Sequence, residues 1–311
     1  MKNKLWTSDF VVEDDIVFVK KTGHRFPLDL KLWHDIFTWF CFYYFSVFWR
    51  VKRRLTGHPR PSIAFLPDKP RPWYLIWPVM HCAGAKLVDD PANADIVMSF
   101  DDATTCDPQL PDLNYRRQKV RTVNFNCRDI SKSAVSSAFE RVAGYSLSVD
   151  PESYTGPIVD KSEVNAAHDG RIVQGPIDRQ PGRCYQRLID NTIDGGLVED
   201  LRTCTVGGQP VLVFIKRRPI GRRFANENVD VGWVRPEEVF SPAEIDLIRR
   251  FNSEIQLEWG GVDVLRDKSD GRIYIVDANK TDMGPPVAMK LGQKLRATRL
   301  LARAFGKAFA P

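Results

Sequence analysis

The sequence lacks the marks of several common protein classes. Its six cysteines show no C-x-x-C spacing, which argues against a zinc site or a disulfide framework in a chain of 311 residues and favours reduced thiols. No uncharged run reaches the roughly 20 residues that a helix needs to cross a bilayer. The first residues also lack the apolar core of a signal peptide, because acidic residues follow Lys2 and Lys4. We therefore expect a globular cytoplasmic protein.

The excess of positive charge is small. A net charge of +6 and a pI near 9.0 favour partners that carry phosphate or carboxylate groups, or an anionic membrane surface. A basic cluster precedes Asn226 and consists of Lys216, Arg217, Arg218, Arg222 and Arg223. No aromatic residues are interleaved with these cations, as single-strand binding requires, so we expect no nucleic-acid partner. The cluster is either a solvated face or a grip for phosphate and an acidic substrate, with Lys216 or Arg217 nearest the chemistry.

The least usual segment covers residues 32–49. Between Ile36 and Trp49 it contains no charge, most of its residues are aromatic, and its apolar residues do not mark a single helical face. A basic group follows, comprising Arg50, Lys52, Arg53 and Arg54. Aromatic residues favour the membrane interface, and basic residues favour anionic lipid. Two interpretations stay open: residues 32–54 contact the inner face of a membrane, or the segment is buried against the core or a protein partner.

Two boundaries divide the first half of the chain. Prolines between Gly57 and Pro72 mark the end of an N-terminal extension, which we assign to residues 1–59. From residue 60 to 130, short apolar runs alternate with turns, which predicts a small α/β lobe whose parallel sheet is covered by helices. Residues 101–105, an acidic loop after one predicted strand, either touch a substrate or form an ordinary polar loop.

A hairpin is predicted between residues 260 and 286. Asp270-Gly271, flanked by alternating apolar residues, is a strong hairpin signal. We expect residues 269–271 to form a three-residue loop with Gly271 in the left-handed conformation. Lys268 then pairs with Arg272.

This register brings acidic residues together. Asp263 lies directly opposite Asp277, and Asn279 falls on the same face because side chains alternate along a strand. Like charges directly opposite destabilise a sheet, so we expect removal of one charge to raise stability without metal. Magnesium held by one or two carboxylates and substrate phosphates fits this set. The alternative is an exposed hairpin whose carboxylates are solvated.

The segments before and after the hairpin follow a definite order. The predicted elements are a helix from Ser131 to about Val142 that stops at Gly144, a strand at 157–161 ending in Lys161, a polar loop at 165–171, a strand at 172–174, a strand from Cys184, and a hairpin at 199–218 about Gly207-Gly208. A capping box at residues 241–244 starts a further helix. Apolar residues after position 291 predict a closing helix.

In this order, residues 131–286 resemble the ATP-grasp family. The resemblance rests on the strand lysine before a polar lid, the strand and linker at 184–190, the D-x-R motif Asp200-Leu201-Arg202, the basic strand after it and the acidic hairpin. It implies an α+β and α/β architecture: two α+β subdomains that grip ATP, preceded by a small α/β lobe and the aromatic N-terminal segment. The ATP-grasp region is assigned to residues 131–290, and residues 291–311 form a C-terminal helix.

The resemblance also implies roles for individual residues. ATP is expected to contact Lys161, Gln186, Leu188, Ile189 and Asp200, and the adenine is expected to be read mainly by backbone groups. Magnesium is expected at Asp263, Asp277 and Asn279. The residues expected to act on the reacting groups are Arg202, Lys216, Arg217 and Arg223. The six cysteines and His168 are expected to be structural or loop residues.

The family's usual reaction gives the expected activity. ATP phosphorylates a carboxylate, and an amine or similar nucleophile displaces phosphate. A small-molecule, peptide or polymer carboxylate is the expected substrate, with cell-envelope or secondary-metabolite biosynthesis as the expected setting. Two alternatives stay open: a kinase of the same fold that acts on a hydroxyl group, and a non-catalytic nucleotide-binding protein at the membrane.

Overall fold

The computed structural model describes residues 10–19, 25–57, 60–109, 120–165, 167, 169–225, 228–287 and 289–309. Lys2, Lys4, His168 and Asn226 lie outside the described residues, so the expectations placed on them are not addressed by the structure.

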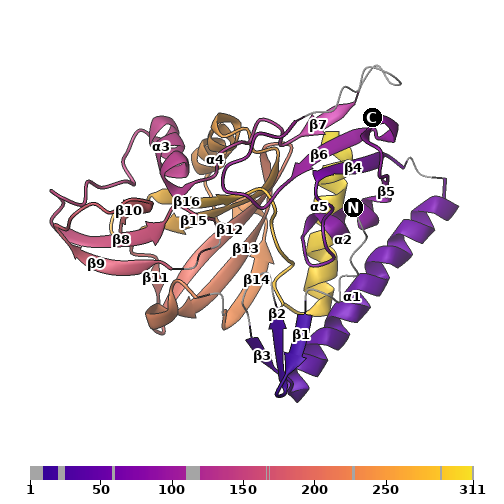
Figure 1. Cartoon of the computed structure of the whole chain (residues 1–311), viewed down its shortest axis with the longest axis horizontal. Helices are drawn as coiled ribbons and strands as arrows, with labels where there is room; N and C mark the ends of the chain where they lie inside the picture. The colour runs from indigo at the N-terminus through magenta and orange to yellow at the C-terminus, as the bar shows by residue number, and fades with distance from the viewer. Residues whose placement is uncertain are drawn as a thin grey trace.

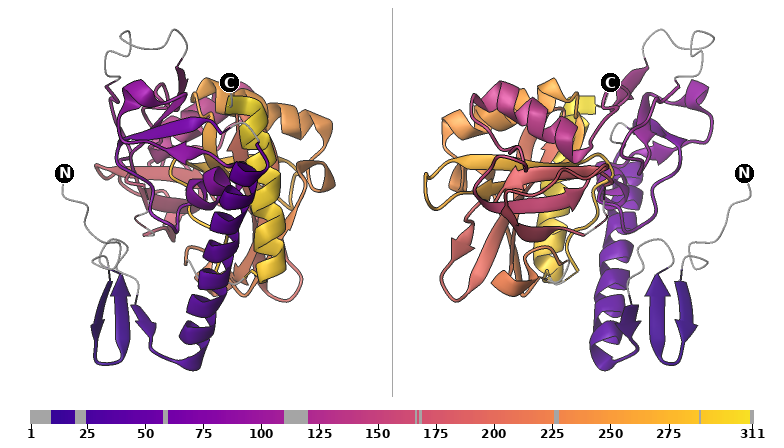
Figure 2. Two further views of the ribbon diagram at one scale, coloured as in Figure 1. Left: turned by 90° about the vertical axis from the view of Figure 1, so that its right-hand side faces the viewer. Right: turned by 60° about the vertical axis from the view of Figure 1, so that its left-hand side comes forward.

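The N-terminal part consists of a small sheet and one long helix (Figure 1). Strands β1 (Phe10–Glu13), β2 (Ile16–Val19) and β3 (Arg25–Pro27) form an antiparallel sheet in that order. Helix α1 (Leu30–Leu55) begins where the Asp29 carboxylate accepts a hydrogen bond from the Leu32 amide at 2.7 Å. Figure 2 shows this sheet beside the N-terminal end of α1, away from the rest of the chain.

A small α/β lobe follows, as predicted. Its elements are β4 (Ser62–Pro67), α2 (Ile76–Ala83), β5 (Lys86–Leu87), the 3-10 helix η2 (Pro91–Asn93), β6 (Ile96–Phe100) and β7 (Arg121–Val123). The sheet has the order β5-β4-β6-β7, and all its pairs are parallel. Parallel sheets are buried on both faces, and the strands β4 and β6 are accordingly almost wholly apolar.

A second small sheet is antiparallel and follows helix α3 (Lys132–Ala143). The Ser131 hydroxyl caps α3 by accepting from the Ala134 amide at 3.3 Å, and Gly144 ends it in the left-handed conformation, as the sequence predicts. Strands β8 (Gly156–Ser162), β9 (Arg171–Gly175) and β10 (Arg183–Arg187) form the sheet in the order β10-β8-β9.

The large sheet forms the centre of the molecule (Figure 1). Its strands are β11 (Thr192–Ile193), β12 (Leu197–Val206), β13 (Gln209–Pro219), β14 (Asp230–Val234), β15 (Trp259–Arg266) and β16 (Ile273–Asn279), in the order β14-β13-β12-β15-β16 with β11 on β12. The remaining elements are the 3-10 helices η3 (Ile220–Arg222) and η4 (Pro236–Glu238), and the helices α4 (Pro242–Glu254) and α5 (Leu291–Phe309). The capping box that starts α4 is present, with Ser241 and Glu244 bonded to each other's backbone.

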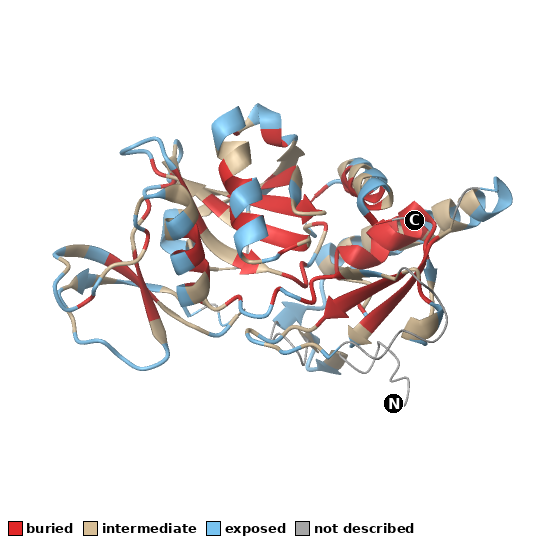
Figure 3. Cartoon of the chain, turned by 90° about the horizontal axis from the view of Figure 1, so that it is seen from above, coloured by how far each residue is buried: buried red, intermediate tan, exposed pale blue. Residues whose placement is uncertain are grey.

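Each face of the large sheet has its own core, and Figure 3 shows its strands as mostly buried. On one face, here called the α5 face, Cys204, Phe214 and Trp259 pack with apolar residues of α2 and α5. On the opposite face, here called the α4 face, Leu201 and Val262 pack with apolar residues of α3 and α4. Helix α5 therefore completes a core and does not stand apart.

Helix α1 is apolar on two sides, which explains why its sequence marks no single face. Phe42 is buried, and Tyr43 stacks on Trp77 of α2 with ring centroids 4.2 Å apart. The opposite side of the helix carries exposed aromatic residues, among them Phe37 and Phe40. No helix in the described part of the chain is long and apolar enough to cross a membrane.

The α/β lobe is joined to the segment that follows β16. Tyr74 and Met283 form an antiparallel bridge, the Leu75 amide donates to the Asp282 carbonyl at 2.8 Å, and the Gly284 amide donates to the Trp73 carbonyl at 3.1 Å. The end of the acidic hairpin is therefore held by residues about 200 positions earlier in the chain.

Candidate functional site

The structure confirms that Asp263 pairs directly with Asp277, although the hairpin differs from the prediction near its turn. Asp267, not Lys268, pairs with Arg272, and the loop therefore has four residues and not three. A β-bulge corrects the register, because Val264 pairs with Ile275 and leaves Val276 as an extra residue. Gly271 has φ = 71° and is in the left-handed conformation, as predicted.

The bulge has a direct link to the predicted phosphate-binding lysine. The extra residue of a bulge is left out of the ladder, and the Val276 carbonyl accepts a hydrogen bond from Lys161 Nζ at 2.9 Å. Burial lowers the pKa of Lys161, and Asp277 partly offsets that shift. Strand β8 thus places the Lys161 ammonium at the residue that directly precedes Asp277.

A second lysine, which the sequence analysis did not identify, contacts the acidic pair. Lys132 is the first residue of α3, and its Nζ lies 2.5 Å from Asp277 Oδ1. The Lys132 side chain is 8% exposed, so this is a nearly buried ion pair. Asp277 Oδ1 also accepts from the Ala278 amide at 2.9 Å.

Arg202 of the D-x-R motif lies between two carboxylates. Its NH1 is 3.0 Å from Asp263 Oδ2 and its NH2 is 2.8 Å from Asp282 Oδ1. Burial alone raises the pKa of Asp263, but Arg202 and Lys216 outweigh it and bring the pKa to about 2. Gly261 makes room for this network, because a Cβ atom there would lie 2.4 Å from Asp282 Oδ2 and 2.7 Å from Arg202 Nε.

The structure separates Lys216 from Arg217. Residues directly opposite each other share a face, so Lys216, opposite Asp200, lies on the α5 face with Arg202 and Asp263. Arg217 lies on the α4 face, where it pairs with Glu199 at 2.8 Å and Asp230 at 2.9 Å. Lys216 forms no hydrogen bond or ion pair with any described residue. The site therefore includes Lys216 and does not include the Arg217 side chain.

Asp200 and Arg223 border the same site. Arg218 NH2 lies 2.5 Å from Asp200 Oδ2, and Asn191 Nδ2 donates to Asp200 Oδ1 at 2.9 Å. Burial raises the pKa of Asp200 to about 6, although Arg218 opposes the shift. Arg223 NH2 donates to Asn191 Oδ1 at 3.2 Å, and burial lowers the pKa of Arg223. Asp200 and Arg223 are thus joined through Asn191.

The acidic pair offers two oxygens for a cation. Asp263 Oδ1 and Asp277 Oδ2 accept no hydrogen bond from the described residues, whereas Asn279 Oδ1 already accepts from the Thr281 amide at 2.8 Å and from its hydroxyl at 3.1 Å. Among the described residues, no group of three or more His, Cys, Asp or Glu side chains could hold a metal ion by itself. Two hard carboxylate oxygens fit magnesium that takes its other ligands from phosphate and water.

The three residues expected near adenine lie on and just after β10, as predicted. Gln186 is buried, and its Nε2 donates to Ser136 Oγ at 2.7 Å. Ile189 is buried in the core of the α4 face, and the Leu188 amide donates to the Pro157 carbonyl at 3.4 Å. The side chains of Gln186 and Ile189 are therefore structural, which leaves backbone groups for any nucleotide contact.

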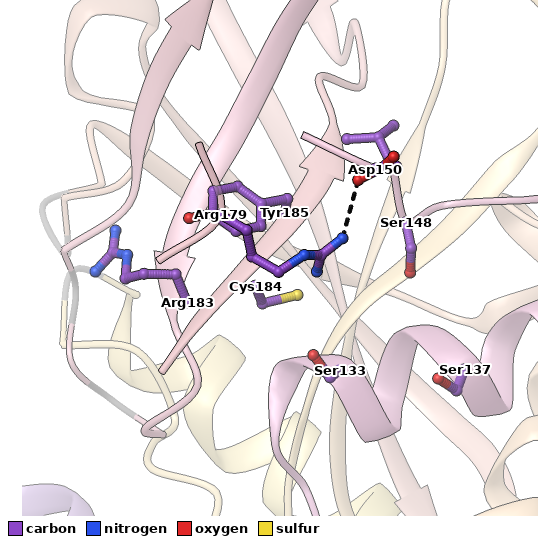
Figure 4. Close-up of a pocket in the computed structure, with 9 residues that line it drawn as sticks. Ser133, Ser137, Ser148, Asp150, Arg179, Arg183, Cys184 and Tyr185 are labelled. Carbon is purple, nitrogen blue, oxygen red and sulfur yellow. Dashed lines mark hydrogen bonds and ion pairs between the residues drawn. The ribbon is translucent and has the colours of Figure 1, made fainter. Parts of the chain in front are cut away.

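A polar cavity of about 320 Å³ lies between α3 and β10 (Figure 4). It includes Ser133 and Ser137 of α3, and Arg179 crosses it to pair with Asp150 at 3.0 Å. Its lining includes Cys184 and Tyr185 of β10 but none of the residues expected to contact ATP, magnesium or the reacting groups. We do not assign it to the candidate site.

The residues that the sequence analysis missed are mainly partners of those it found. They are Lys132 and Asp282, and Arg218 belongs with them in part, because the sequence analysis placed it in the basic cluster without identifying Asp200 as its partner. Lys132 directly follows the predicted helix cap, where a lysine usually faces solvent, and only the fold brings it to Asp277. The six cysteines are all free, as expected. Residues 101–105 contact the lid region, because Thr104 Oγ1 accepts from the Asn165 amide at 2.8 Å.

Comparison with known proteins identifies the fold. No protein-family model matches the chain, and no curated protein matches its sequence. Among solved structures, the ATP-grasp ligase PsnB with a minimal precursor is 13% identical, covers 80% of this chain and 99% of its own, and has a TM-score of 0.50. The same ligase with a phosphomimetic precursor variant, Mg and ADP is also 13% identical, covers 80% and 98%, and has a TM-score of 0.51. The chain has the ATP-grasp fold, which confirms the predicted fold class.

Proposed function

We propose that this chain is an ATP-dependent, ADP-forming ligase that activates a carboxylate as an acyl phosphate and joins it to an amine or a similar nucleophile. The observation that carries the proposal is the pairing of Asp263 with Asp277, with Lys132, Lys161, Lys216 and Arg202 arranged around the pair. The ATP-grasp ligase PsnB, which has this fold and whose structure with Mg and ADP is known, supports the nucleotide and the reaction class.

The charges of the site suit phosphoryl transfer. The four cations, Arg218 and Arg223 stand against Asp200, Asp263, Asp277 and Asp282, which gives six positive charges, four negative charges and a net charge of +2. Fixed cations stabilise the charge that develops on phosphate oxygens, and they act most strongly in a partly buried site. No nucleophilic side chain is required.

Each step can be assigned to residues of this chain. Lys132 and Lys161, both fixed beside Asp277, hold the phosphates of ATP in place while a substrate carboxylate oxygen attacks the γ-phosphorus and ADP leaves. Lys216 faces the transferred group from β13. The amine then attacks the acyl carbon, loses a proton, and phosphate leaves. Arg202 keeps Asp263 ionised and oriented.

Asp263 and Asp277 would hold magnesium through the two oxygens that accept no hydrogen bond from the described residues. When bound, magnesium offsets the negative charge of the phosphates. Asn279 contributes by fixing the turn at Thr281, since its Oδ1 accepts two hydrogen bonds there.

Trapping of the intermediate tests the reaction class. Hydroxylamine intercepts acyl phosphates, so the protein with ATP, magnesium and a panel of amino acids, peptides and sugar acids should give a hydroxamate with ADP and phosphate in equal amounts. The products are measured by mass spectrometry and nucleotide chromatography. AMP as the nucleotide product would contradict the proposal. ADP with a stable phosphoester and no free phosphate would instead identify a kinase.

A substitution of Lys161 tests the phosphate site. Lys161→Ala should slow ATP turnover on the order of 10²-fold or more, because misplaced phosphates lose the benefit of positioning. Lys69, an exposed lysine of the α/β lobe paired with Asp89, provides the matched control Lys69→Ala. Turnover is measured as ADP released per minute. If the two variants turn over ATP equally fast, Lys161 does not position phosphate.

A further inference from the structure

We propose that helix α1 docks on a membrane surface of anionic lipid, with the helix lying in the plane of the interface. The surface in question is the aromatic face of α1, defined by Trp33, Phe37, Phe40, Tyr44 and Phe48. The proposal concerns location and is independent of the ligase chemistry.

The aromatic face is a continuous stripe. Its residues follow one another at intervals of three or four, so they lie on one side of the helix. Phe37, Phe40 and Tyr44 are 65%, 66% and 61% exposed, which is far more than aromatic residues in a protein core retain. Leu30 and Leu55 extend the stripe to both ends of a helix about 39 Å long.

Helix α1 cannot rotate to bury this stripe, because its opposite side is already engaged. Phe42 is 1% exposed, Tyr43 stacks on Trp77, and Arg53 NH1 donates to the Ala83 carbonyl at 3.2 Å. Figure 2 shows α1 beside α5 at the edge of the molecule, with one side directed away from the rest of the chain. The aromatic face is thus a permanent surface feature.

The charges beside the C-terminal half of the stripe are of one sign. Exposed Lys52 and Arg54 close α1, and exposed Arg299 and Arg303 of α5 lie beside them. Lys52 and Arg299 approach the same Trp49 ring, at 4.9 and 4.4 Å from its centroid. Neither residues 36–55 nor residues 291–309 contain a carboxylate. This basic patch complements anionic lipid headgroups.

Lipid fits better than a second copy of the chain. Trp and Tyr side chains are suited to the boundary between headgroups and acyl chains, and basic residues beside an apolar helical face are typical of helices that lie in that plane. A second copy would have no carboxylate on either helix range to meet the basic patch of its partner. We therefore commit to an anionic lipid surface.

Flotation with the full chain tests the proposal. Vesicles of phosphatidylcholine with phosphatidylglycerol should carry the protein to the top of a density gradient at low salt, and vesicles of phosphatidylcholine alone should carry at least about tenfold less. Phe37→Glu with Phe40→Glu should weaken binding on the order of a hundredfold. Lys52→Gln with Arg54→Gln should weaken binding to the anionic vesicles about 25-fold, about fivefold for each cation.

Matched controls separate docking from folding. Val229→Glu places one such carboxylate at a site that is 62% exposed and lies on the β13–β14 connection, and it should bind vesicles as the unaltered chain does. All variants should unfold at the same temperature, since the substituted side chains are exposed. Failure to bind either vesicle would overturn the proposal. So would a dimer in sedimentation equilibrium that the Phe37 and Phe40 substitutions dissociate, because the occupant is then a second copy.

Discussion

Asp277→Asn should lower magnesium-dependent ATP turnover by about 10³-fold, the upper range for loss of one group that stabilises charge in a transition state. The carboxylate is placed by two features: the bulge at Val276 sets its register opposite Asp263, and Lys132 holds its Oδ1. The substitution keeps the shape of the side chain and removes the charge. ADP release at saturating magnesium and ATP measures the effect.

The same substitution should also destabilise the protein, which reverses the expectation from the sequence. Like charges opposite each other predict a gain in stability, but Asp277 neutralises Lys132, whose side chain is 8% exposed. Loss of one partner of such a pair costs up to about 3 kcal/mol of unfolding free energy. Urea denaturation measures it. Lys132→Met combined with Asp277→Asn should recover stability but not turnover.

A control substitution shows whether the effect of Asp277→Asn depends on the position of the carboxylate or only on the loss of one negative charge. Asp178 is an exposed carboxylate before β10, and Asp178→Asn should leave both turnover and unfolding free energy near their original values. Asp277→Asn with unchanged turnover would remove the acidic pair from the proposed chemistry. If Asp178→Asn lowered turnover as much as Asp277→Asn does, the loss would reflect the change in net charge and not the position of Asp277.

Lys216→Met should lower turnover by about 10²–10³-fold and leave stability almost unchanged. Lys216 faces Asp263 and Asp200 but forms no hydrogen bond or ion pair with any described residue, so its charge is available to phosphate or to an acidic substrate. Because Lys216 acts on Asp263 and Asp200 only through longer-range attraction, its removal should change the unfolding free energy by about 1 kcal/mol or less.

Arg217 provides the control for Lys216. Arg217 follows directly in the chain but lies on the α4 face, paired with Glu199 and Asp230. Arg217→Met should therefore keep turnover close to that of the unaltered chain. Lys216→Met with normal turnover, or a larger loss for Arg217→Met, would place the reacting groups on the other face of the sheet. ADP release and urea denaturation are measured side by side for both variants.

Local signals in the sequence predict much of this fold. Ser131 and Ser241 are N-cap residues, because each hydroxyl accepts a hydrogen bond from the backbone amide three residues later. Such a cap depends only on residues close together in the sequence, so it can be predicted from them. The Asp263–Asp277 pairing is also predicted, although the turn is one residue longer than expected. The added loop residue shifts the strand register by one residue and the bulge shifts it back. The predicted pairing is therefore correct although the predicted turn is not.

What the sequence does not reveal depends on contacts between distant segments. Lys132 reaches Asp277 across 145 positions, and Asp282 reaches Arg202 across 80. The choice between Lys216 and Arg217 depends on the register of β13 against β12, which no local pattern determines. The sequence of α1 does not show which side of the helix is buried, because aromatic residues lie on both the buried and the exposed side.

The bulge at Val276 also limits how the hairpin can change in length during evolution. Side chains alternate along a strand, so one residue gained or lost within the paired part of β15 or β16 between the aspartates and the loop would turn one carboxylate to the opposite face. A second insertion or deletion of one residue at the bulge returns both carboxylates to the same face. A residue gained or lost within these two strands therefore requires a compensating change, whereas the loop itself can vary in length without moving the carboxylates.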